Sequence, residues 1–157
     1  MKKVASSNLI PFSKTEHKGA PWFCLNRQMN FGDVAEVQTR YILTGIVAPK
    51  DGNTAFDKGS DIPELNCSVK SGKATLTSKK LGNSFEEVLE NYFQQTASTL
   101  WAWYIQVDEE GWVYLMNARE FETFTREFAG FDEKRQVIRY KTSSGKMIAW
   151  LENKLVG

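Results

Sequence analysis

The sequence predicts a mixed α/β (α+β) domain in which helices flank a mixed central β-sheet. Ser84 precedes Glu87 by three residues, which is the capping signature of a helix start, and Asn117 and Glu120 repeat it. A nearly continuous apolar and aromatic run over residues 100–107 is typical of a strand buried on both faces. With 157 residues, of which 41% are hydrophobic and 25% charged, we expect one domain with one core.

The first half of the chain contains one clear helical pattern. Residues 1–29 form an arm without clear periodicity, and its start is too short and polar for a secretory segment. A helix is expected over residues 30–45, because apolar residues recur there at helical spacing before a glycine. A loop rich in turn residues is expected over 49–53, and short extended pieces over 55–56 and 65–71.

The second half is predicted to alternate helices and strands. Within residues 100–107, strand alternation places Trp101, Trp103 and Ile105 on one face, where core packing explains them better than contact with nucleic acid. The other expected elements are a helix from Ser84, a strand over 112–116 after a turn at 108–111, a helix from Asn117, and strands over 137–140 and 147–151 paired around a turn at 143–145. The domain thus divides into an arm (1–29), a core (30–116) and a C-terminal helix and β-hairpin (117–157).

Residues 61–72 hold the polar side chains most suggestive of chemistry. Asp61 precedes Ser68 by seven residues and Lys70 by nine. If residues 66–71 are extended, Ser68 and Lys70 project from the same face and set a hydroxyl beside an ammonium. Phosphodiester hydrolysis needs a water to be activated and developing charge to be neutralised, and Mg²⁺ held by carboxylates supplies both.

The order Asp61-Ile-Pro-Glu-Leu followed by Val69-Lys70 resembles the PD-(D/E)xK nucleases, most closely the MutH-type mismatch-repair endonucleases and their GATC-cutting restriction relatives. The resemblance covers about residues 31–72. It implies a restriction-endonuclease-like core and Mg²⁺-dependent, restriction-type cleavage of double-stranded DNA, with Mn²⁺ able to substitute. Because the chain is small and a double-strand break needs two active sites, a homodimer is the expected cutting form, whereas a monomer would suit nicking. With no run of eighteen apolar residues, we expect a cytoplasmic protein without membrane contact. We also expect a prokaryotic or phage origin.

The resemblance also implies a role for each residue of the site. Asp61 would bind the metal directly. Glu36, on the helix upstream, matches the family's upstream glutamate and would hold the metal or its water shell. Lys70 would orient or activate the attacking water, and the backbone carbonyl beside Ser68 would complete the protein ligands.

Ser68 departs from the family pattern, which has glutamate at that position. Glu86 or Glu87, from the next helix, would supply the missing carboxylate. Glu64 is a poorer candidate, because it follows a proline between the two halves of the motif and is expected to face solvent. Asp57 competes with Asp61, since it lies eleven residues before Ser68, a separation that other nucleases of this superfamily also use.

A second interpretation stays open beside the enzyme. Taken singly, Asp61 is a turn aspartate, Glu36 a solvated helix residue and Lys70 a residue of an edge strand, so only their joint spacing indicates a site. Without a carboxylate at Ser68, the chain is alternatively a catalytically inactive nuclease-fold module that binds nucleic acid or another protein. Metal-dependent cleavage distinguishes the two interpretations, since only the enzyme would cut DNA.

Local charge indicates where DNA would bind, although the net charge is only +1. Residues 66–85 carry four lysines and no carboxylate, and further cations lie near the C-terminus. Such side chains suit contacts with the phosphate backbone. The expected DNA-binding residues are Lys73, Lys79, Lys80, Arg139 and Lys141.

Overall fold

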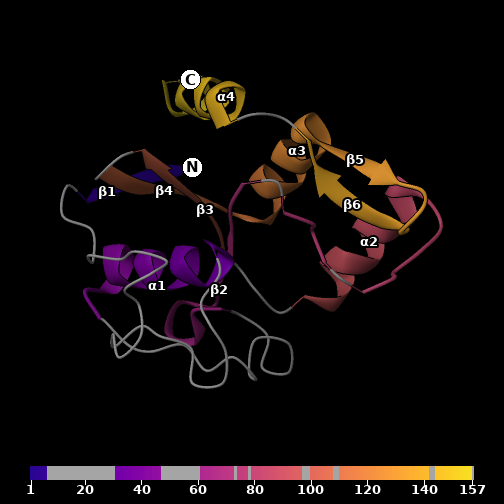
Figure 1. Cartoon of the computed structure of the whole chain (residues 1–157), viewed down its shortest axis with the longest axis horizontal. Coiled ribbons are helices and arrows are strands. Elements are labelled where there is room, and N and C mark those ends of the chain that lie inside the picture. The colour runs from indigo at the N-terminus through magenta and orange to yellow at the C-terminus, as the bar shows by residue number, and fades with distance from the viewer. Residues whose placement is uncertain are drawn as a thin grey trace.

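The computed structural model describes residues 1–6, 31–46, 61–72, 74–77, 79–96, 100–107, 110–141 and 144–156. These ranges form a mixed α and β fold, as the sequence predicts (Figure 1). In chain order the elements are β1 (Lys2–Ser6), α1 (Phe31–Thr44), the 3-10 helix η1 (Pro63–Leu65), β2 (Cys67–Lys70), α2 (Phe85–Gln95), β3 (Leu100–Val107), β4 (Glu110–Met116), α3 (Ala118–Phe128), β5 (Ala129–Asp132), β6 (Val137–Tyr140) and α4 (Ser144–Val156).

Four strands form the central sheet in the order β1-β4-β3-β2. β3 and β4 make the antiparallel hairpin that the sequence predicts, and β1 pairs antiparallel with β4. β2 runs parallel to β3, with Lys70 opposite Trp103, and α2 lies in the connection between them. The central sheet is therefore mixed, and β5 and β6 form a separate two-stranded sheet.

The two faces of the central sheet bury different cores. α1 packs on one face, whereas α2, α3, α4 and β6 pack on the other (Figure 1). The alternation predicted for β3 is confirmed, because Trp101, Trp103 and Ile105 belong to the larger core and Ala102 and Tyr104 to the α1 side. β3 is thus buried on both faces along most of its length.

Local signals set the ends of three helices. Asn117 Oδ1 accepts a hydrogen bond from the Glu120 N–H at 2.8 Å, and the Asn117 N–H donates to Glu120 Oε1 at 3.0 Å, which confirms the predicted capping box of α3. Ser84 Oγ accepts from the Glu87 N–H at 3.2 Å and caps α2. α1 ends at Gly45, whose φ of +75° is a conformation that glycine adopts at little cost.

The C-terminal prediction is wrong in one respect. Residues 144–156 form α4 rather than a strand, so the hairpin expected around 143–145 does not exist, and β6 pairs with β5 instead. Met147 and Leu151 are both buried in the larger core and are four residues apart, which is helical spacing. A five-residue apolar run fits a strand and a buried helix equally well, so local pattern could not choose between them.

The start of the predicted arm also differs from expectation, because residues 2–6 form the edge strand β1. The remainder of the arm, the loop expected over 49–53 and the extended piece over 55–56 lie outside the described residues, as does Asp57. Among the helices in the described ranges, none is long and apolar enough to cross a membrane.

Candidate functional site

Asp61 lies beside β2 because the chain reverses tightly between them. Ile62 and Cys67 form an antiparallel bridge, with Ile62 N–H donating to Cys67 O at 2.9 Å and Cys67 N–H to Ile62 O at 3.2 Å. η1 and Asn66, which has a left-handed φ of +49°, make the reversal. Asp61 Oδ2 then accepts a hydrogen bond from the Val69 N–H at 2.8 Å. This bond fixes the carboxylate next to the strand that carries Lys70.

Lys70 is partly buried, and its ammonium has defined partners. Nζ donates to Leu76 O at 2.7 Å and to Thr75 O at 3.3 Å. Burial lowers the pKa of Lys70 below its ordinary 10.5, while the carboxylates of Asp61 and Glu36 act in the opposite direction. Both carboxylates therefore favour the charged form of the ammonium, and the Val69 bond fixes Asp61 beside the strand that carries Lys70.

Glu36 reaches the site from α1, on which it is half-buried. Ser68 lies on β2 between Asp61's partner Val69 and the buried Cys67, and it is only 8% exposed. Burial, with a further contribution from Asp61, raises the pKa of the Cys67 thiol to about 12. β2 thus offers a buried serine at the position where the family pattern would have a carboxylate, and the neighbouring Cys67 thiol stays protonated.

The structure does not bring the two α2 glutamates to Asp61. Glu86 accepts hydrogen bonds from both terminal nitrogens of Arg126, at 2.5 and 3.0 Å, and is therefore held against α3. A Cβ at Gly82 would lie 2.6 Å from Glu87 Cγ, so the Glu87 side chain lies over the backbone of that residue. Neither is among the carboxylates that influence the pKa of Lys70. Glu64 is exposed, as predicted, and pairs with Arg40 at 2.5 Å.

α2 instead contributes Tyr92 to the surroundings of Asp61. Tyr92 Oη accepts a hydrogen bond from Trp101 Nε1 at 3.2 Å. Burial raises the pKa of Tyr92, and the negative charge of Asp61 adds to this shift. The sequence analysis assigned Tyr92 only to the apolar face of its helix, and no spacing rule links a tyrosine to an aspartate 31 positions earlier.

Within the described ranges, no three His, Cys, Asp or Glu side chains gather to hold a metal ion. Two carboxylates, those of Asp61 and Glu36, act on one ammonium. Mg²⁺ is commonly bound by one or two protein carboxylates, with waters and substrate phosphate oxygens completing its shell. The donor set present therefore fits Mg²⁺ shared with a phosphate, and does not fit an ion enclosed by protein alone.

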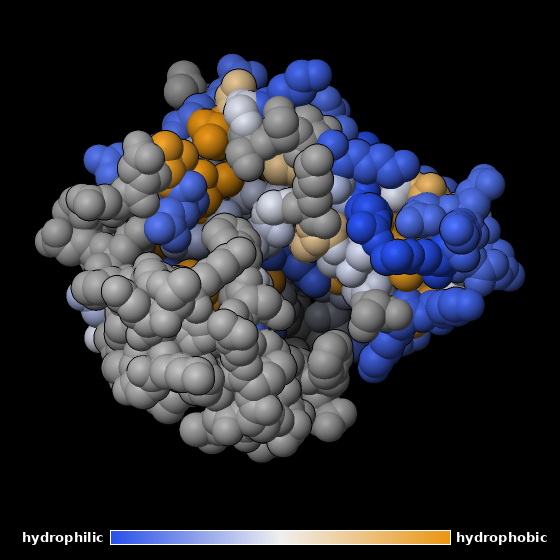
Figure 2. Space-filling model, viewed as in Figure 1, coloured by the Kyte–Doolittle hydropathy of each residue, from blue (hydrophilic) through white to orange (hydrophobic). Residues whose placement is uncertain are grey.

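The basic residues form a surface over β6 and the loop before α2. Lys79, Lys80 and Lys141 are exposed, and Arg139 lies on β6 with Nε 3.7 Å from Asp132 Oδ2. Gln136 Nε2 donates to Asn83 Oδ1 at 3.1 Å and joins the β5–β6 turn to this loop. Figure 2 shows hydrophilic residues across the region of α2, β5 and β6. Lys73 lies outside the described residues.

Residues 74–76 connect this basic surface to the Lys70 ammonium. Leu76 N–H donates to Ile138 O at 2.9 Å, and Tyr140 N–H donates to Ala74 O at 3.0 Å, so the segment pairs with β6. The carbonyls of Thr75 and Leu76 accept from Lys70 on its other side. Only one extended segment therefore separates β6, which carries Arg139, from the ammonium.

No protein-family model matches the chain, and neither a curated protein nor a solved structure matches it.

Proposed function

We propose that the protein is a metal-dependent endonuclease of the PD-(D/E)xK type that hydrolyses phosphodiester bonds in double-stranded DNA. The observation that carries this proposal is the Asp61 carboxylate, which the Val69 N–H fixes beside the strand that carries Lys70. The negative charge of Glu36, from α1, also acts on the Lys70 ammonium. The parallel pairing of β2 with β3 across α2 is compatible with the strand, helix and strand order of a restriction-endonuclease-like core. A restriction role would require sequence-specific, double-strand cleavage.

When bound, Mg²⁺ supplies a polarised water and positive charge beside the phosphate. Asp61 uses Oδ2 to accept from Val69, so its carboxylate is oriented in advance and its second oxygen is the one to offer to a metal. Glu36 offers the second carboxylate. Lys70, held by two carbonyls, orients the attacking water and stabilises negative charge on the phosphate oxygens. In the reaction the attacking water gives up a proton to solvent as its oxygen bonds to phosphorus, the P–O bond to the leaving sugar breaks, and a solvent water protonates the leaving oxygen.

The basic surface of Lys79, Lys80, Arg139 and Lys141 would hold the DNA backbone. Its cations can neutralise phosphates, so affinity should fall as salt increases. Hydrogen bonds between residues 74–76 and β6 place this basic surface next to Lys70. A homodimer would carry two sites and cut both strands, whereas a monomer would nick one strand.

The test is cleavage of supercoiled plasmid by purified protein in Mg²⁺ or Mn²⁺, with EDTA as the metal-free control. Metal-dependent conversion to linear or nicked product is expected. Asp61→Asn, Glu36→Gln and Lys70→Met should each reduce the rate about a hundredfold or more, because each removes a group assigned to metal, water or transition-state charge.

Glu64→Gln is the matched control, since Glu64 is an exposed carboxylate of the same segment that pairs with Arg40. Its rate should stay within about twofold of the parent, because an exposed ion pair contributes little. Equal loss of activity in Glu64→Gln and Asp61→Asn would contradict the proposed site. Circular dichroism of each variant separates loss of chemistry from loss of fold.

A second candidate is a catalytically inactive module that binds DNA or a protein on the same fold. The buried Ser68, where the family has glutamate, favours it, as does the pairing of Glu86 with Arg126, which already engages both of its carboxylate oxygens. This candidate predicts DNA binding that weakens when Lys79 and Lys80 become glutamine, and no cleavage with any divalent metal. Cleavage abolished by Asp61→Asn would exclude it.

A further inference from the structure

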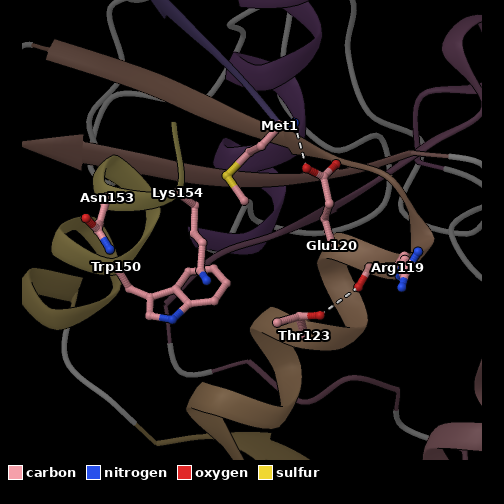
Figure 3. A pocket seen from close by; sticks show the side chains of 7 residues that line it. All are labelled: Met1, Arg119, Glu120, Thr123, Trp150, Asn153 and Lys154. Carbon is pink, nitrogen blue, oxygen red and sulfur yellow. Dashed lines mark hydrogen bonds and ion pairs between the residues drawn. The ribbon is translucent and has the colours of Figure 1, made fainter. Parts of the chain in front are cut away.

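A cavity of about 620 Å³ lies beside the opposite edge of the central sheet from β2. It opens between the start of α3, the C-terminal half of α4 and the residue before β1 (Figure 3). β1 and β2 are the two outer strands of the sheet, so this cavity is separate from the Asp61 site. The residues that line it are Met1, Arg119, Glu120, Thr123, Trp150, Asn153 and Lys154.

Trp150 gives the cavity an anchored aromatic wall. Its indole makes edge-type contacts with Phe124 and Phe128, at centroid distances of 5.9 and 5.7 Å, which fix its orientation. Lys154 Nζ lies over the ring, 5.1 Å from its centroid. Because Lys154 is an exposed, flexible residue, a planar group can take its place over the indole while the ammonium moves to an adjacent anion. The Met1 side chain lies across the cavity from Trp150 (Figure 3).

The charges around the cavity favour an anion. Glu120 is its one carboxylate, and its Oε2 lies 2.6 Å from the Met1 amino group while its Oε1 accepts from the Asn117 N–H. The Glu120 charge is therefore already compensated. Arg119 and Lys154 are exposed and have no ion-pair partner within the described part of the chain. Both guanidinium and ammonium groups bind phosphate.

We propose that this cavity binds a nucleotide. The base stacks on Trp150 against the Met1 thioether, and the phosphate is held by Lys154 and Arg119. Asn153, whose amide can both donate and accept, reaches the polar edge of the base. A free mononucleotide and an unpaired nucleotide within single-stranded DNA share this chemistry, since stacking and phosphate contacts serve both. The proposal does not depend on the nuclease activity.

The test measures binding without hydrolysis, using the Asp61→Asn protein in EDTA. Calorimetric titration with dAMP is compared with deoxyadenosine and inorganic phosphate, and anisotropy follows fluorescein-labelled (dA)12. We expect dAMP to bind about tenfold or more tightly than deoxyadenosine or phosphate alone, because both parts of the nucleotide make contacts. Lys154→Gln and Trp150→Leu should each weaken dAMP binding about tenfold.

Lys146→Gln is the matched control, since Lys146 is an exposed lysine of α4 that does not line the cavity. If the ligand is a free mononucleotide, Lys154→Gln should weaken the binding of dAMP and leave that of (dA)12 unchanged. If the ligand is an unpaired nucleotide of a DNA strand, Lys154→Gln should weaken the binding of (dA)12. The proposal is overturned if neither ligand binds at millimolar concentration, or if Lys154→Gln and Lys146→Gln change binding equally. Lys154→Gln removes an exposed charge and its contact with the Trp150 ring, and neither is part of the buried core. Its result therefore holds even if Trp150→Leu lowers stability.

Discussion

At the scale of single residues, Lys70 connects the candidate chemistry to the surrounding backbone. Its ammonium donates to the carbonyls of Thr75 and Leu76 and interacts with the carboxylates of Asp61 and Glu36. The hydrogen bonds hold the charge in place before any substrate arrives, which is the preorganisation that electrostatic catalysis requires. The same bonds give Lys70 a structural role that must be measured separately from activity.

Replacing Lys70 with methionine should lower the free energy of unfolding by about 1–3 kcal/mol. Methionine keeps an unbranched side chain, but the carbonyls of Thr75 and Leu76 lose their donor, and two carboxylates lose a positive charge that acts on them. Urea denaturation in EDTA measures the change without metal. A Lys70→Met protein as stable as the parent would contradict the expected loss and would show that relief of the buried charge offsets the two hydrogen bonds.

Cys67 should be unreactive in the native protein. It is fully buried, and burial raises its pKa to about 12, so the thiolate is scarce at pH 8. In a Cys24→Ser variant, which leaves Cys67 as the single thiol, Ellman's reagent should react slowly in buffer and rapidly in guanidinium chloride. Rapid reaction in buffer would contradict the tight packing of β2 against α1.

Sequence could predict part of the candidate site and not the rest. Asp61 and Lys70 lie on either side of a short chain reversal, so residues that are close in sequence here are also close in the fold. Glu86 could not be excluded from its sequence position, because its direction is set by Arg126, forty residues later. Tyr92 could not be found for the same reason, since only the packing of α2 on β3 brings it near Asp61.

At the scale of elements, helix starts are the most predictable features of the chain. A capping box depends on four consecutive residues, so the Asn117 and Glu120 signature carries its full information locally. α4 lacks such a signature, and its apolar residues become interpretable only once α3 and β3 provide the core that they enter. Strand β1 is similar, because its pairing with β4 defines it more than its own five residues do.

Asn117→Ala should lower the free energy of unfolding by about 1 kcal/mol, because the first turn of α3 loses its side-chain acceptor. Asn153→Ala is the matched control, since Asn153 is an exposed asparagine within α4. There alanine should be neutral or slightly stabilising, as the better helix former. Urea midpoints measure both, and equal effects at the two positions would argue against the cap.

At the scale of the whole molecule, ion pairs join elements that are distant in sequence. Glu86 links α2 to Arg126 of α3, and Glu152 links α4 to Lys3 of β1 and to the Tyr114 hydroxyl of β4. These contacts surround the larger core, which the aromatic residues of β3 and α3 dominate. The core supplies most of the stability, and the ion pairs make part of it dependent on pH.

Acid should therefore destabilise the protein through these two carboxylates. Hydrogen bonds from Arg126 and Lys3 lower the pKa values of Glu86 and Glu152 below the ordinary 4.5. A lowered folded-state pKa gives stability that is present above about pH 4.5 and is lost as the pH falls through the folded value. Urea midpoints between pH 7 and pH 3 should fall less in a Glu86→Gln, Glu152→Gln protein than in the parent. An identical fall would contradict the assignment.

The pairing of residues 74–76 with β6 has a consequence for a chain still being synthesised. The carbonyls that hold the Lys70 ammonium lie on a segment whose other edge bonds Ile138 and Tyr140, and these residues are synthesised long after Lys70 itself. Asp61 and Val69 emerge much earlier, but their lysine gains its full setting only when β6 docks. A nascent chain that has not yet reached β6 therefore holds Asp61 and Lys70 without the backbone acceptors that position the ammonium.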